Sequence, residues 1–129
     1  MKPVSRLILR LALGGLSTLL LGSAARPPLV EAHTLTQTFG GVLLQASFQP
    51  RGHNSLSGAW YDGGRAKLLR CSPHCRVVTR IPLDGPLMTG QDSVYRVVLA
   101  GHFRSGQRLK LVMRFENLQL VTVTVGVGR

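Results

Sequence analysis

The chain has 129 residues, of which 44% are hydrophobic and 5% aromatic, and its 16 basic residues against 5 acidic ones give a formal charge of +11. This length limits the chain to one small domain. The aliphatic content excludes a wholly disordered chain, and 15 Gly with 7 Pro in no repeating pattern exclude a collagen-like or low-complexity class. A compact, turn-rich fold remains.

The first segment has the pattern of a secretory signal peptide. Three basic residues within the first ten precede an apolar run at residues 11–21, and small residues follow at 22–25. A transmembrane helix needs roughly 20 apolar residues, so this run is too short to span a membrane. The sequence therefore predicts a periplasmic or secreted protein without a transmembrane helix in its mature chain. The alternative is an uncleaved anchor in the membrane interface.

The position of cleavage decides where the mature chain begins. Cleavage after Ala24, Ala25 or Ala32 would each follow small residues, and we expect residues 1–32 to form the leader and residues 33–129 a single domain. After cleavage at Ala32, His33 would offer an amine nitrogen and a ring nitrogen as a chelate for copper. Otherwise His33 is an ordinary polar residue of a strand.

Much of the positive charge lies outside the leader. Residues 33–129 contain 12 basic and 4 acidic residues, which leaves a formal charge of +8. Such a charge favours an acidic protein or an anionic surface as partner. Nucleic acid is disfavoured because an exported chain seldom meets it. The alternative is that the positive charge serves only to keep the protein soluble and has no specific partner.

Alternating apolar and polar residues predict strands throughout the rest of the chain. The expected strands are residues 34–39, 42–48, 55–61, 65–70, 76–83, 94–100, 109–115 and 121–127. Residues 55–70 are expected to form a hairpin, with Trp60 inward as a core anchor. Seven or eight short strands predict an all-β fold, a small antiparallel β-sandwich of the immunoglobulin or cupredoxin type, or a partly open barrel.

The strand at residues 109–115 has one apolar and one basic face. Leucine, methionine and phenylalanine alternate with cations, as expected of a strand with one buried face. The outward cations Arg108, Lys110 and Arg114 form a candidate interaction face.

The two cysteines of the chain, Cys71 and Cys75, flank a short loop. In an exported protein the first interpretation is a disulfide. The second is a copper or zinc site formed by both thiolates and His74. A fourth ligand would come from elsewhere, and the candidates are His33, His53, His102, Met88 and Met113.

A third interpretation treats the loop as a presented tip. The sequence Cys71-Ser72-Pro73-His74-Cys75 resembles the Cys-bounded, Pro-His loop of bacterial periplasmic lysozyme inhibitors. The resemblance implies that His74 enters the active site of a lysozyme. The match covers these residues alone, and the loop is one residue shorter than the inhibitor loop.

Residues for catalysis are few. The acids after residue 32 are Asp62, Asp84, Asp92 and Glu116, and no pair has a spacing suited to general acid and base chemistry. No nucleophile-elbow or phosphate-loop pattern is present. We therefore expect a binding role and no enzymatic activity.

One longer segment resembles a known family. Residues 94–127 are similar to the closing strands of periplasmic copper-chaperone domains in their Leu-Ala-Gly turn, the Phe115-Glu116 strand end and the Val/Thr-rich final strand. The resemblance implies an exported sandwich that binds Cu(I) through His and Met. The positions that match the family's His-x-Met pair hold Tyr95, Arg96, Val97 and Val98, which are not soft ligands.

Two functions are therefore expected from the sequence. The first is copper binding or handling outside the cytoplasm, with Cys71, His74 and Cys75 as ligands and His33 as an optional fourth. The second is a protein-interaction module or enzyme inhibitor that presents a disulfide-fixed 71–75 loop together with the basic face.

Overall fold

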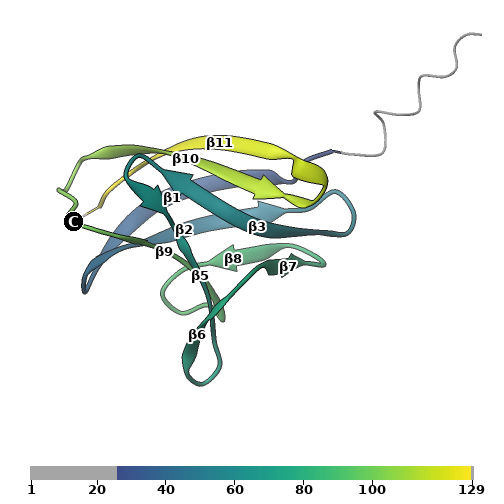
Figure 1. Ribbon diagram of the computed structural model, residues 1–129, viewed down its shortest axis with the longest axis horizontal. Helices are drawn as coiled ribbons and strands as arrows, with labels where there is room; N and C mark the ends of the chain where they lie inside the picture. Colours follow the sequence, from purple (N-terminus) through teal and green to yellow (C-terminus); the bar gives the residue numbers. More distant parts are fainter. Residues whose placement is uncertain (1–25, 129) are drawn as a thin grey trace, which may run out of the picture.

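The computed structural model describes residues 26–128 and shows two packed antiparallel sheets (Figure 1). The predicted all-β sandwich is confirmed. Eleven strands are present in the described part of the chain, more than the seven or eight expected, because the expected strands 65–70 and 76–83 are each divided in two and a short strand forms at residues 87–89, where none was expected. The first 25 residues of the predicted leader, 1–32, lie outside the described residues.

The first sheet has six strands and carries the Cys71–Cys75 hairpin at one edge. Its main order is β1 (Leu29–Thr38), β2 (Gly41–Gln49), β9 (Tyr95–Ala100), β5 (Lys67–Cys71) and β6 (Cys75–Val78). The short strand β8 (Leu87–Thr89) pairs with β2 beyond the end of β9. β1 and β6 are therefore the opposite edges of this sheet.

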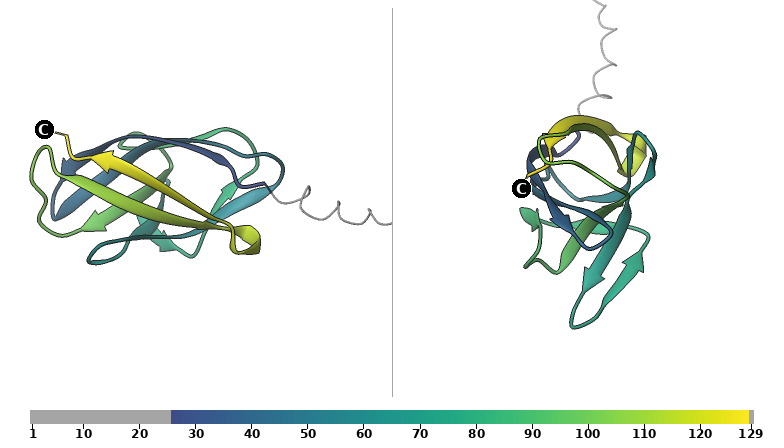
Figure 2. Two further views of the ribbon diagram at one scale, coloured as in Figure 1. Left: turned by 90° about the horizontal axis from the view of Figure 1, so that it is seen from above. Right: turned by 90° about the vertical axis from the view of Figure 1, so that its left-hand side faces the viewer.

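The second sheet has five strands and presents the basic face predicted from the sequence. Its main order is β11 (Leu120–Gly126), β10 (Arg108–Phe115), β3 (Asn54–Tyr61) and β4 (Gly64–Arg65), and β7 (Ile81–Leu83) pairs with the start of β3. A 3-10 turn, η3 (Glu116–Leu118), joins β10 to β11. Figure 2 shows these two strands side by side along the molecule.

Apolar residues that alternate along the strands fill the space between the sheets. The buried side of β2 is formed by Val42, Leu44, Ala46 and Phe48, and that of β10 by Leu109, Leu111, Met113 and Phe115, as the alternation predicts. The rings of Phe48 and Phe115 meet edge to face with centroids 6.4 Å apart. This contact joins the two sheets through the core.

The prediction that Trp60 lies in the core is wrong. Ala59 is fully buried opposite Met113, whereas Trp60 pairs with Val112 on the outer face and is half-buried. The cause is a β-bulge, because Arg114 pairs with Gly58 and the next residue of β10 pairs with Leu56, which leaves Ser57 as the extra residue. One extra residue reverses which side of the strand faces inward.

Two expected strands cross between the sheets instead of continuing in one. After β4 the chain leaves the second sheet at Ala66, and β5 pairs with β9 in the first, so the expected 55–70 hairpin is limited to two residue pairs. Residues 76–83 divide into β6 and β7, one in each sheet. Val77 is consequently 65% exposed while Ile81 is fully buried, although alternation places them on one face.

A seam between β1 and β11 closes one side of the sandwich. Leu35 and Val127 form a parallel bridge, and the Gly128 amide donates a hydrogen bond to the Leu35 carbonyl at 2.8 Å. The Thr34 hydroxyl donates to the Gly126 carbonyl at 3.3 Å. The first and last strands of the described chain therefore hold the sheets together along this edge.

Candidate functional site

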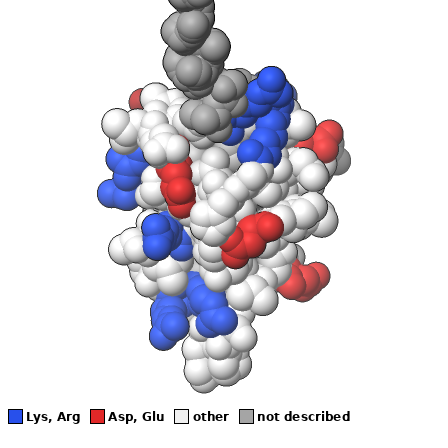
Figure 3. Space-filling model, turned by 90° about the vertical axis from the view of Figure 1, so that its right-hand side faces the viewer, with Lys and Arg blue, Asp and Glu red and all other residues white. Residues whose placement is uncertain are grey.

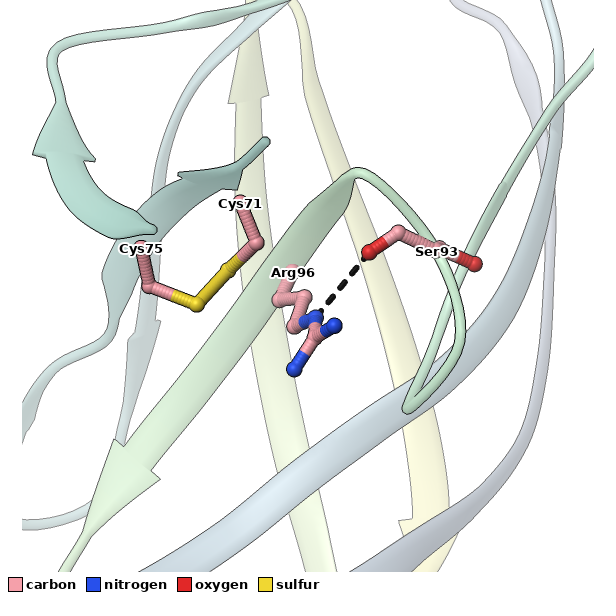
Figure 4. The surroundings of a disulfide bond; sticks show 4 residues. All are labelled: Cys71, Cys75, Ser93 and Arg96. Carbon is pink, nitrogen blue, oxygen red and sulfur yellow. Dashed lines mark hydrogen bonds between the residues drawn. A yellow bond between two sulfur atoms is a disulfide. The ribbon is translucent and has the colours of Figure 1, made fainter. Parts of the chain in front are cut away.

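The β5–β6 hairpin extends away from the sandwich and is closed near its tip by a disulfide (Figures 1 and 2). Cys71 pairs with Cys75 across the hairpin, and Figure 4 shows their sulfur atoms bonded, near Arg96 and Ser93. The disulfide predicted from the sequence is thus present in the structure. It fixes a three-residue tip that contains His74.

Strand β5 is held up to the disulfide by the segment that leads into β9, and this segment is itself closed by a side-chain hydrogen bond. The Cys71 amide donates to the Val94 carbonyl at 2.6 Å, and Arg96 Nε donates to the Ser93 carbonyl at 3.0 Å (Figure 4). Leu68 is buried at the root of β5. The projecting tip is therefore supported on one side by an anchored strand, β5.

The hairpin is cationic and its tip is exposed. Arg70 and Arg76 pair across it directly below the disulfide, and His74 is exposed at the tip. Residues 67–78, which make up the hairpin, contain three Arg or Lys and no Asp or Glu. Figure 3 shows blue side chains gathered just above the pale tip at the bottom of the molecule. The positive field of this segment is therefore not offset by an acid within it.

The predicted metal ligands are only partly brought together. Cys71 and Cys75 are bonded to each other, so in this oxidation state they cannot act as thiolate ligands and the residues do not fit a copper ion. His33 lies in β1, separated from β5 by β2 and β9, which is three strand spacings or about 14 Å. Its Nε2 lies 3.1 Å from the Ser47 hydroxyl.

No group of three His, Cys, Asp or Glu side chains within residues 26–128 is arranged to hold a metal ion. The other candidate fourth ligands are also spread over the fold. His53 pairs with Asp84 at 3.0 Å, Met113 is buried in the core, and Met88 is exposed on β8. The copper assignment stays a prediction for the reduced chain.

The candidate basic face lies where the alternation of β10 predicts it, on the outer side of the second sheet. Arg108 and Lys110 are exposed there, and Arg114 is half-buried against Trp60. The guanidinium carbons of Arg114 and Arg65 lie 4.9 and 5.1 Å from the Trp60 ring centroid. The sequence did not indicate the association with Trp60 and Arg65, because it depends on the bulge at Ser57.

Two of the carboxylates that follow residue 32 have polar partners. Glu116 accepts a hydrogen bond from the Ser55 hydroxyl at 2.9 Å, and Asp84 pairs with His53. That this protein is not an enzyme stays a prediction.

Comparison of the sequence with family models found no matching family, and comparison with curated proteins found no significant relative. The resemblances to copper chaperones and to lysozyme inhibitors therefore stay predictions. Within the described residues, no helix is long and apolar enough to cross a membrane.

Proposed function

We propose that this protein is an exported, non-enzymatic binding module that inserts its disulfide-closed β5–β6 hairpin into an acidic cleft of a partner protein. The observation that carries the proposal is the hairpin itself, which projects at the edge of the first sheet and places cations beside an exposed tip. A cleft lined by carboxylates complements this charge, and such complementarity raises the rate of association and selects partners.

The disulfide supports the proposal because it restricts the tip before binding. A loop that is already ordered loses less conformational entropy when it enters a cleft. Val77, 65% exposed on the flank of the hairpin, adds an apolar surface beside the cations. The hairpin thus combines a rigid tip, positive charge and an apolar side.

The most specific form of the proposal is inhibition of a lysozyme. Enzymes that cleave glycosidic bonds use a pair of carboxylates at the active site, which a cationic tip would complement. His74 is the residue that would reach them, with Arg70 and Arg76 at the rim.

The test is the rate at which a lysozyme clears a peptidoglycan suspension in the presence of the protein. The wild-type protein is expected to slow clearing, and His74→Ala is expected to lose most of this effect. His53→Ala, which changes an exposed histidine of another loop, is the matched control and should inhibit normally. If the wild-type protein at micromolar concentration does not slow clearing, the proposal that it inhibits a lysozyme is wrong.

A second experiment tests the broader proposal. A photo-crosslinking amino acid is placed at the exposed position of His74 and, as the control, at Phe39, which is fully exposed but lies in the β1–β2 turn. Crosslinking in cells is expected to give a discrete protein adduct from position 74 and none from position 39. No adduct from position 74, or the same adduct from both positions, would contradict insertion of the hairpin.

Copper binding, the other function expected from the sequence, applies to the reduced hairpin. Titration of the reduced protein with Cu(I) tests it, with Cys71→Ser as the comparison. Saturable binding that Cys71→Ser removes would support a site made by Cys71, His74 and Cys75. Equal binding by the two proteins would exclude these thiolates as ligands.

A further inference from the structure

The outer face of the second sheet carries a second, separate arrangement of cations. Arg108, Lys110 and Arg114 point outward from β10 within seven residues, a row about 20 Å long at the rise of a β-strand. Arg65 joins the row from β4, on the far side of β3. This face lies on the second sheet, whereas the hairpin belongs to the first.

Two of these cations are held in place by residues of β3. Arg114 Nε donates to the Ser57 hydroxyl at 3.0 Å, and that hydroxyl donates to the Arg114 carbonyl at 3.1 Å. Arg65 Nη2 donates to the Ser57 carbonyl at 3.5 Å. The Trp60 ring lies within about 5 Å of both guanidinium groups. Cation–π contacts and hydrogen bonds thus fix two positive charges on either side of one strand.

These guanidinium groups have no acidic partner. Within residues 26–128 the one ion pair joins His53 and Asp84, so neither Arg65 nor Arg114 is neutralised by a carboxylate. Two guanidinium groups without a carboxylate partner make the surface around Trp60 favourable for an anion. A carboxylate is suited to it because guanidinium groups bind carboxylates through paired hydrogen bonds.

Hydroxyl groups and a hollow lie beside the cations. Thr124 pairs with Lys110, and Thr122 pairs with Val112, so two exposed hydroxyls lie on the same outer face. An open hollow of about 570 Å³ is lined by Trp60, Asp62, Gln107, Arg108 and Lys110, among others. Asp62 is an acid in this hollow and can accept hydrogen bonds from hydroxyl groups.

We propose that this face binds an extended acidic polysaccharide, with sugar carboxylates bound along the row Arg108, Lys110 and Arg114 and a further one at Arg65, on the other side of Trp60. A row of cations beside threonine hydroxyls complements a polymer that carries both carboxylates and hydroxyls. Single-stranded nucleic acid fits less well, because its bases stack on exposed aromatic rings and Trp60 is already flanked by two guanidinium groups. A membrane fits less well because Thr122 and Thr124 on β11 and Asp62 in the hollow place polar and acidic groups beside the cations.

The probe is hexagalacturonate, a carboxylated oligosaccharide, titrated into the protein while Trp60 fluorescence is recorded. Trp60 is the single tryptophan of the chain, so any change in emission reports on this site. We expect saturable binding that weakens with salt. The double variant Arg65→Gln/Arg114→Gln is expected to raise the Kd by at least about tenfold. Lys110→Gln, which leaves the Trp60 cluster intact, should raise it by about threefold.

The matched control removes the same charge from the hairpin. Arg70→Gln/Arg76→Gln should change the Kd by less than about twofold, because these residues lie in the other sheet. An equal loss in both double variants would show attraction by net charge and overturn the site. The absence of saturable binding by the folded wild-type protein would overturn it as well.

Three further ligands identify the polymer class. A neutral cellohexaose should not bind, and a six-nucleotide single strand or anionic lipid vesicles should bind no better to the wild-type protein than to Arg65→Gln/Arg114→Gln. Tighter binding of the oligonucleotide or the vesicles through Arg65 and Arg114 would replace the polysaccharide assignment. Since the hairpin variant is the control, failure of this proposal leaves the proposed hairpin function untouched.

Discussion

At the scale of single residues, the outer face of the second sheet depends on Ser57 and Gly58. Ser57 is the extra residue of the bulge, and it turns Trp60 outward and hydrogen-bonds with both Arg65 and Arg114. Gly58 leaves room for the Trp60 ring, because a Cβ there would lie 2.6 Å from Trp60 Cη2. One small residue therefore decides how the only tryptophan packs.

We predict that Gly58→Ala lowers the free energy of unfolding by about 1–3 kcal/mol, the usual cost of overpacking. The added methyl group must displace the ring, so Trp60 emission should also shift to longer wavelength. Urea unfolding followed by fluorescence measures both effects.

Gly85→Ala is the matched control for this substitution, because no heavy atom lies within 4 Å of a Cβ at Gly85. It should change the free energy of unfolding by less than about 0.5 kcal/mol. Equal effects of the two alanine variants would show that contact with the Trp60 ring is not the cause.

At the scale of strands, the sequence predicts the long strands but not the points at which the chain passes from one sheet to the other. The faces of β2, β10 and β11 follow from alternation because each strand has one side against the core. The division of segment 76–83 between the two sheets does not follow from alternation. A strand of either sheet has the same alternating pattern, because in both sheets the inward side chains face the core. The strand β8 lies in an expected loop, because its pairing partner β2 is far away in the sequence.

The same distinction applies to the candidate sites. Arg108, Lys110 and Arg114 could be predicted because they lie on one strand, and the Cys71–Cys75 pair because it lies in one loop. The cluster around Trp60 could not, because it requires the register of three strands and a bulge. The placement of His33 at the far edge from Cys71 likewise depends on the order of strands in the sheet.

Loss of the disulfide should loosen the hairpin and leave the sandwich intact. The closed loop of five residues contributes at most about 2 kcal/mol through chain entropy. In Cys71→Ser/Cys75→Ser, amide hydrogen exchange should therefore accelerate in β6 and remain unchanged in β10. Faster exchange in both strands would show that the hairpin and the core unfold together.

At the scale of the whole molecule, β1 is a structural part of the sandwich over its full length. Residues 29–32 pair with β2, and Val30 and Ala32 pack against the core. These residues belong to the expected leader if cleavage follows Ala32, and to the mature domain if it follows Ala24 or Ala25. Cleavage after Ala32 would therefore remove residues that pair with β2, whereas cleavage after Ala24 or Ala25 would keep them.

We predict that a chain of residues 33–129 is less stable than one of residues 26–129 by about 1–3 kcal/mol, since two partly buried apolar side chains and part of a strand are lost. Urea unfolding of the two purified chains measures the difference. A third chain, residues 29–129, is the control and should match the longer one. Equal stability of all three would mean that residues 29–32 contribute nothing to the fold.

The seam between β1 and β11 also determines how the molecule responds to mechanical force. The two strands run parallel at Leu35 and Val127, and the described chain starts and finishes at opposite ends of the long axis (Figure 1). Traction on the two ends therefore acts along the strands, and the hydrogen bonds of the seam and of the β1–β2 ladder are sheared together. Bonds sheared together must break at the same time, whereas β6 at the far edge can be peeled away one bond after another. The sandwich should thus resist stretching from its ends most strongly at the strands that close it.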